Sequence, residues 1–135
     1  MTITATLEMS NDGLFSVYSE TKLGNSFLGG FGNSSQEAKD DFITSISEAI
    51  EECEADGIAH PLPNDIEVHF IYDLSAFLGE FDWLNLSKLA NYLGVSSSQL
   101  RYYKKKGAYA SKAQRLKIEN GLHALASRLS NVMLV

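Results

Sequence analysis

Apolar and polar residues alternate strictly in two segments of the first half of the chain, residues 3–9 and residues 66–72. A period of two predicts β-strands with one buried face. The turn sequence Asn11-Asp12-Gly13 predicts a hairpin whose return strand covers residues 14–19. A third strand is expected at 26–31, where Gly29 and Gly30 indicate a bulge or a close backbone approach.

Between the third and the last of these strands, the apolar period becomes that of a helix. Ser34 and Glu37 have the spacing of a capping box at its start, and Gly57 stands where it would end. The apolar positions of this helix are Ala38, Phe42, Ile43, Ile46, Ala49, Ile50 and Cys53. The first half therefore has the predicted order βββαβ.

The polar groups of this half have structural interpretations. Cys53 lies on the apolar stripe and is expected to be a buried, inert thiol, and His69 is expected to face solvent. The helix carboxylates are expected to form a solvated face, with an acidic docking surface as the alternative: Glu51, Glu52, Glu54 and Asp56. The glycines of 29–32 match no phosphate-binding motif.

In the second half, a connecting helix is expected at 74–84, followed by two short helices. The first short helix covers 86–93, where Asn85 can cap it. Gly94-Val95-Ser96 forms the turn, and the second helix covers 97–104. Two short helices joined by a three-residue turn with glycine are typical of a DNA-reading helix-turn-helix.

Five apolar residues are expected to fill the small core of this pair: Leu89, Ala90, Leu93, Val95 and Leu100. This arrangement exposes the front of the second helix, and arginine and glutamine side chains there can pair with guanine and adenine. Lysines at the end of the same helix suit phosphates. The candidate DNA-binding residues are Ser97, Ser98, Gln99, Arg101, Tyr102, Lys104, Lys105 and Lys106.

A last helix is expected to begin at Ser111, which with Gln114 has capping-box spacing. Its apolar stripe continues to Val135, further than the small core requires. Gly121 interrupts the stripe and indicates either close packing or a break. We expect residues 125–135, the N-terminal sheet, or both to form a homodimer interface.

The distribution of charge modifies what the total charge implies. The whole chain has a net charge of −6, which by itself argues against nucleic acid. Residues 1–83 carry −14, however, and residues 84–135 carry +8. Such asymmetry is a hint of nucleic-acid contact by the basic part and of two domains with different partners.

Other classes of function lack support in the sequence. One cysteine permits no internal disulfide, and three scattered histidines show no metal-ligand spacing. No paired carboxylates accompany a nucleophile or a histidine. Neither a signal peptide nor a membrane span is expected. We therefore expect a cytoplasmic protein without cofactor or metal that is not an enzyme.

Residues Leu86 to Gly107 resemble the lambda-repressor-like (XRE-type) helix-turn-helix pattern. The matching pieces are the Leu89-Ala90 pair, the turn that begins at Gly94, and the aromatic Tyr103 before the basic residues. The resemblance covers about 22 residues well and implies binding to double-stranded DNA.

The N-terminal half resembles the HicB antitoxin family in its order of elements. The matching pieces are the Asn11-Asp12-Gly13 turn and the helix start at 35–38. The family implies a degenerate ribonuclease-H-like fold without catalysis. It also implies binding of a small basic toxin and repression of the antitoxin's own operon.

Together these patterns predict an α+β protein with a βββαβ interaction domain at 1–73 and a helix-turn-helix domain at 74–135. The expected function is a dimeric, sequence-specific transcriptional regulator, namely an autorepressing HicB-type antitoxin of a toxin–antitoxin pair. The alternative is a protein-interaction module that does not bind DNA, whose acidic N-terminal domain docks a basic partner.

Overall fold

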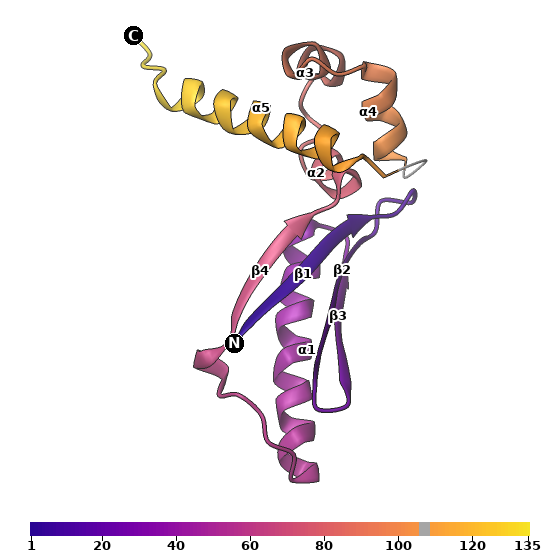
Figure 1. Ribbon diagram of the computed structural model, residues 1–135, viewed down its shortest axis with the longest axis vertical. Coiled ribbons are helices and arrows are strands. Elements are labelled where there is room, and N and C mark those ends of the chain that lie inside the picture. The colour runs from indigo at the N-terminus through magenta and orange to yellow at the C-terminus, as the bar shows by residue number, and fades with distance from the viewer. Residues whose placement is uncertain (106–108) are drawn as a thin grey trace. The chain divides into compact units, whose positions relative to one another are not determined.

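A computed structural model describes residues 1–105 and 109–135 of the chain, which form an α+β protein (Figure 1). The chain divides into two compact units, residues 1–80 and residues 81–135. The sequence placed this division after residue 73. The difference is the short helix 74–80, whose contacts are with strands of the first unit.

A four-stranded mixed sheet forms the first unit. Its strands are β1 (Thr2–Met9), β2 (Phe15–Leu23), β3 (Ser26–Gly32) and β4 (Glu67–Tyr72), in the order β3-β2-β1-β4. The pairs β1–β2 and β2–β3 are antiparallel, whereas β4 lies parallel to β1 with Ile3 opposite Val68. All four predicted strands are therefore present.

The hairpin between β1 and β2 forms as its turn residues predict. Gly13 has a φ of 88°, which favours glycine, and the Asp12 carboxylate accepts hydrogen bonds from Ser10 Oγ and from the backbone N–H of Leu14. The predicted end of β2 at residue 19 is wrong, because the strand continues to Leu23. An irregularity in its pairing with β3 lies between Tyr18 and Lys22, where alternation in the sequence is lost.

Helix α1 (Ser35–Asp56) covers one face of this sheet (Figure 1). The hydroxyl of Ser34 accepts from the backbone N–H of Glu37 at 3.1 Å, and Gly57 ends the helix with a φ of 67°. Its apolar face and the inner face of the sheet form one core: Ile3, Ala5, Leu7, Phe15, Val17, Leu23, Leu28, Ala38, Phe42, Ile46, Ala49, Ile50 and Ala76.

The close backbone approach predicted at the glycine pair is confirmed for Gly30. A Cβ atom at this position would collide with backbone atoms of Phe42 and Ala38. At Gly29, by contrast, it would meet the carbonyl oxygen of Val17 at an ordinary 3.5 Å. Gly30 therefore allows α1 to lie directly against β3.

A short 3₁₀ helix (Pro63–Asp65) precedes β4, and helix α2 (Leu74–Glu80) follows it. The Asp73 carboxylate accepts from the backbone N–H of Ser75 at 2.9 Å, which caps α2. The buried Ser75 hydroxyl accepts in turn from the backbone N–H of Met9 at 3.1 Å. The predicted extension of this helix to residue 84 is wrong, since residues 81–83 form a turn.

The second unit consists of helices α3 (Leu86–Leu93), α4 (Ser97–Lys104) and α5 (Lys112–Ser130). The positions of α3 and α4 and the start of α5 agree with those expected from the sequence. The helical stripe expected to continue to Val135 is wrong beyond Ser130, because α5 ends there and residues 131–135 are not helical. In residues 1–105 and 109–135, no helix is both long enough and apolar enough to cross a membrane.

Candidate nucleic-acid interface

Capping side chains fix the ends of α3 and the start of α4. Asn85 Oδ1 accepts from the backbone N–H of Lys88 at 2.9 Å. Gly94 ends α3 with a φ of 71°, a left-handed conformation that a residue with a side chain rarely adopts. Two residues later, the hydroxyl of Ser96 accepts from the backbone N–H of Gln99 at 3.2 Å. The predicted turn between the two short helices is therefore present.

The three helices of this unit share a small core. Its buried side chains are Leu89, Ala90, Leu93, Leu100, Tyr103 and Ile118. Val95, which we expected inside, is only partly buried, because it lies in the turn at the edge of this core. A Cβ on Gly121 would collide with the Leu93 side chain, so this glycine marks close packing of α5 and not a break.

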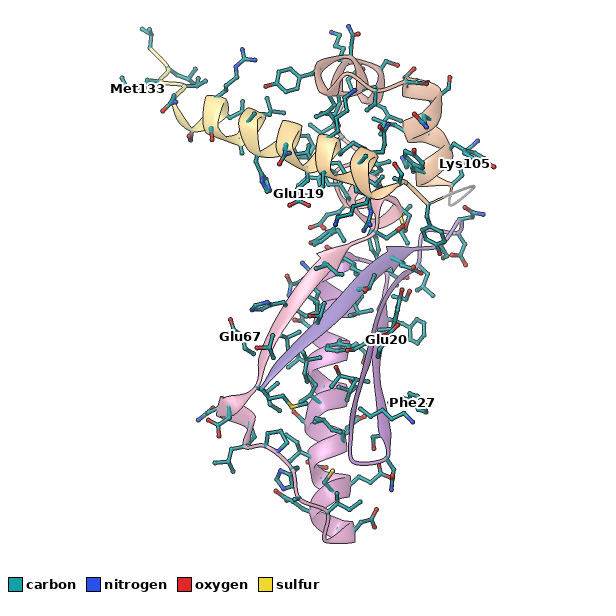
Figure 2. All side chains as sticks on the ribbon, viewed as in Figure 1. Glu20, Phe27, Glu67, Lys105, Glu119 and Met133 are labelled. Carbon is teal, nitrogen blue, oxygen red and sulfur yellow. The ribbon has the colours of Figure 1, made fainter. Side chains whose placement is uncertain are left out.

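The side of α4 that faces away from this core carries most of the candidate residues. Ser98, Gln99, Arg101 and Tyr102 are exposed. Ser97 and Lys104 were expected to be exposed as well, but they are partly buried at the two ends of the helix. Lys105 is exposed just after α4 (Figure 2), and Lys106 lies outside the described residues.

Two hydrogen bonds that the sequence did not indicate tie α4 to its neighbours. Arg101 Nη2 donates to the Ser87 hydroxyl in the first turn of α3 at 2.8 Å. Gln114 Nε2, from the first turn of α5, donates to Gln99 Oε1 at 3.3 Å. A guanidinium has five N–H donors, so one bond to Ser87 restricts the position of Arg101 and leaves donors for a ligand.

The side chain of Gln114 thus differs from the capping box predicted for it. Its backbone N–H donates to the Ser111 hydroxyl at 3.2 Å, as expected. Its amide group, however, contacts α4 instead of returning to the start of α5. The sequence spacing indicates the cap, but it cannot indicate which neighbouring helix the side chain reaches.

A third hydrogen bond between elements of this unit lies at the turn between α3 and α4. Lys117 Nζ donates to the carbonyl oxygen of Gly94 at 2.7 Å. This carbonyl follows the C-terminus of α3, where the partial negative charge of the helix favours a cation. Lys117 therefore holds α5 against the turn between α3 and α4.

The two units differ sharply in charge. Residues 1–80 contain fifteen acidic and two basic side chains, whereas residues 81–135 contain two acidic and nine basic ones. The histidine–carboxylate contacts between described residues, His60 with Glu54 and His69 with Glu67, both lie in the first unit. The hydrogen bond with His69 lowers the pKa of the Glu67 carboxyl below its usual value.

The first unit contains no comparable cluster of candidate groups. Cys53 is 2% exposed, which confirms the expected buried thiol, and His69 is exposed as predicted. The carboxylates at positions 51, 52, 54 and 56 of α1 are also exposed. Over residues 1–105 and 109–135, no group of three or more His, Cys, Asp or Glu residues has the geometry to hold a metal ion.

Comparisons with known proteins found no matching family model, no similar curated protein and no solved structure with a similar fold.

Proposed function

We propose that residues 81–135 are a lambda-repressor-like helix-turn-helix that binds double-stranded DNA, and that the protein is a sequence-specific transcriptional regulator. The observation that carries the proposal is the exposed side of α4. Arg101 and Gln99 flank this side of the short helix, and Leu100 and Tyr103 hold the opposite side in the core.

The local geometry supports this assignment. An eight-residue α3, a turn of three residues and an eight-residue α4 have the lengths of the two helices that read DNA. An α-helix fits the major groove, where arginine donates to O6 and N7 of guanine and glutamine pairs with adenine. The two inter-helix hydrogen bonds restrict both side chains before they meet DNA.

Charge supports the same surface. With a net charge of +7, the second unit attracts phosphates, whereas the first unit carries −13 and repels them. DNA contacts are therefore confined to the second unit. Lys105 just beyond α4, and Lys112 and Arg115 at the start of α5, are exposed cations suited to the DNA backbone.

The first unit suggests the biological context of this regulator. Its βββαβ order and its Asn11-Asp12-Gly13 turn agree with the resemblance to HicB antitoxins. We extend the proposal accordingly to an autorepressing antitoxin that also binds a small basic toxin through a degenerate ribonuclease-H-like domain. The acidic exposed side of α1 supports a basic partner by charge complementarity.

The same acidic surface supports a second candidate function. If the basic unit serves only to balance the charge of the acidic unit, the chain is a protein-interaction module that does not bind DNA. Salt dependence and sequence preference distinguish the two functions, because protein docking produces no selected DNA sequence.

The test is selection of DNA sequences from a random pool by the full chain, followed by binding measurements on the selected site. Arg101→Ala is expected to weaken binding by about 1–3 kcal/mol and to relax the preference at one base pair. Gln99→Ala is expected to relax it at a neighbouring base pair.

Arg128→Ala is a matched control, since the Arg128 guanidinium lies 5.6 Å from the Tyr92 ring centroid and is not on α4. This variant should keep the sequence preference of the native chain. Failure to select any sequence would contradict DNA reading. Native preference in both α4 variants would show that α4 is not the recognition helix.

A further inference from the structure

Apolar residues of α5, and of the segment 131–135 that follows it, extend well beyond the core that the helix helps to form. Ile118 is buried, and Gly121 lies against Leu93, but Leu122 and Leu125 are only partly covered. Beyond them, five apolar residues are mostly exposed: Leu129 (62%), Val132 (59%), Met133 (91%), Leu134 (91%) and Val135 (fully). We call these five residues the tail surface.

The tail surface is distinct from the candidate DNA surface. Figure 1 shows that α5 starts beside α4 and that its C-terminal end lies far from α4. Met133 lies past this end of the helix (Figure 2). A molecule bound to the tail surface would therefore leave the exposed side of α4 uncovered.

The side chains of the tail surface carry no charge. Between residues 120 and 135 the charged side chain is Arg128, whose guanidinium is held over the Tyr92 ring. Phosphates need cations, and a basic protein needs carboxylates. Neither DNA nor the proposed basic partner complements this surface, so its occupant must itself be apolar and uncharged.

We propose that the tail surface binds the tail surface of a second copy of this chain, in a two-fold symmetric dimer. In such an interface each residue meets the same patch on its partner, so identical charges near the axis would repel one another. The neutral composition of the five residues avoids that repulsion. The chain itself thus supplies an apolar surface without charged side chains.

The area available fits a dimer of modest affinity. Each exposed aliphatic side chain offers on the order of 100 Å² of apolar surface. At these exposed fractions, two copies of the tail surface would bury about 800 Å² in total, which is the size of a weak, transient interface. We therefore expect a reversible dimer whose population depends on concentration. This inference does not rest on DNA binding, and either proposal can fail without the other.

Sedimentation velocity of the full chain over a concentration series tests the proposal. The native protein is expected to shift from one to two chains as its concentration rises through the micromolar range. Leu129→Lys/Met133→Lys is expected to remain a single chain up to concentrations at least tenfold above the dimerisation midpoint of the native protein. Because both residues are exposed, circular dichroism should show an unchanged fold.

Leu62→Lys is the matched control, because Leu62 is as exposed as Leu129 (63% against 62%) but lies in the first unit. It should dimerise like the native chain. If the first double variant misfolds, Val132→Lys/Leu134→Lys provides the same test. A native protein that stays monomeric, or a dimer that persists in the tail variants, would overturn the proposal. Equal loss of the dimer in Leu62→Lys would also overturn it.

Discussion

The two units of this protein place their apolar residues differently. In the first unit, a sheet and a 22-residue helix enclose a cluster of thirteen buried residues. In the second, three helices enclose six of the described residues. Both units leave large apolar side chains outside, among them Phe27 and Phe31 in the first unit and Trp83 and the tail surface in the second. A unit with so small a core depends on caps and on a few anchoring side chains. Its exposed apolar residues are therefore the ones to examine for partners.

Charge follows the same division. The acidic unit is the one with the larger core, and the basic unit is the one with the smaller core. The comparison indicates that the first unit is stabilised mainly by its own interior. A ligand that binds only the folded second unit would add to the stability of that unit.

Removal of one core side chain from each unit should separate their stabilities. Phe42 is completely buried and packs edge-to-face on Phe70, with ring centroids 6.0 Å apart. Phe42→Ala should therefore destabilise the first unit by about 3–5 kcal/mol. Leu100→Ala should destabilise the second unit by about 2–5 kcal/mol. Hydrogen exchange followed by mass spectrometry reads the two units separately.

In this experiment each variant is expected to accelerate exchange in its own unit alone. Faster hydrogen exchange of α3 and α4 in Phe42→Ala would contradict separate stabilities of the two units, because it would mean that they unfold together. The exposed substitution Ile43→Ala, on the neighbouring position of α1, should change exchange little and serves as the control.

Glycine contacts sharpen the comparison further. Gly30→Ala forces a methyl group into the backbone of α1, so we expect a loss of about 1–3 kcal/mol from overpacking. Gly29→Ala meets only an ordinary contact and should leave stability nearly unchanged. Thermal unfolding of both variants measures the difference, and equal stability would show that α1 does not lie tightly on β3.

In the second unit, the corresponding close contact is softer. A methyl group on Gly121 would meet the end of the Leu93 side chain, which can rotate away. Replacement of glycine by alanine within a helix also gains about 1 kcal/mol. Gly121→Ala should therefore lower the free energy of unfolding less than Gly30→Ala does. The reason is that Gly121 meets a side chain, whereas Gly30 meets backbone atoms.

The smallest effect expected concerns the lysines at the end of α4. On a selected DNA site, Lys104→Gln/Lys105→Gln should reduce the slope of log K against log salt by about two, because each phosphate contact contributes about 0.9. The loss of affinity between 50 and 200 mM salt should then be about tenfold smaller than in the native chain. Binding titrations at four salt concentrations measure this slope.

The two lysines of the acidic unit provide the control. Lys22→Gln/Lys39→Gln removes the same charge from the same chain, but from residues that lie over aromatic rings of the first unit. Its salt slope should match the native one. A slope that changes equally in both double variants would mean that overall charge, and not the end of α4, determines the salt dependence.

Much of the fold could be predicted because local signals determine it. Ser34 and Gly57 fixed the ends of α1 to within a residue, and Asn85, Gly94 and Ser96 did the same for α3 and α4. Alternation showed which residues of β1 and β4 face inward. It could not show that these two strands are parallel neighbours, since period two carries no information about pairing.

Where prediction failed, the cause lies in contacts between residues distant in sequence. The residues of β2 after Ser19 lose their alternation at an irregularity that only pairing with β3 stabilises. In the candidate interface, most exposed positions of α4 follow from its period, although Ser97 is partly buried. The bond from Arg101 to Ser87, by contrast, spans fourteen residues and depends on how two helices cross.

The parallel pair of β1 and β4 has a consequence for synthesis of the chain. Residue 3 lies opposite residue 68, so one edge of β1 has no strand partner until about 65 more residues have been translated. At typical rates of about 5–20 residues per second, this takes roughly 3–13 seconds. The two hairpins and α1 emerge earlier and can already cover the inner face. During those seconds, the nascent protein presents an open β-edge near the ribosome, whose outward side chains are threonines: Thr2, Thr4 and Thr6.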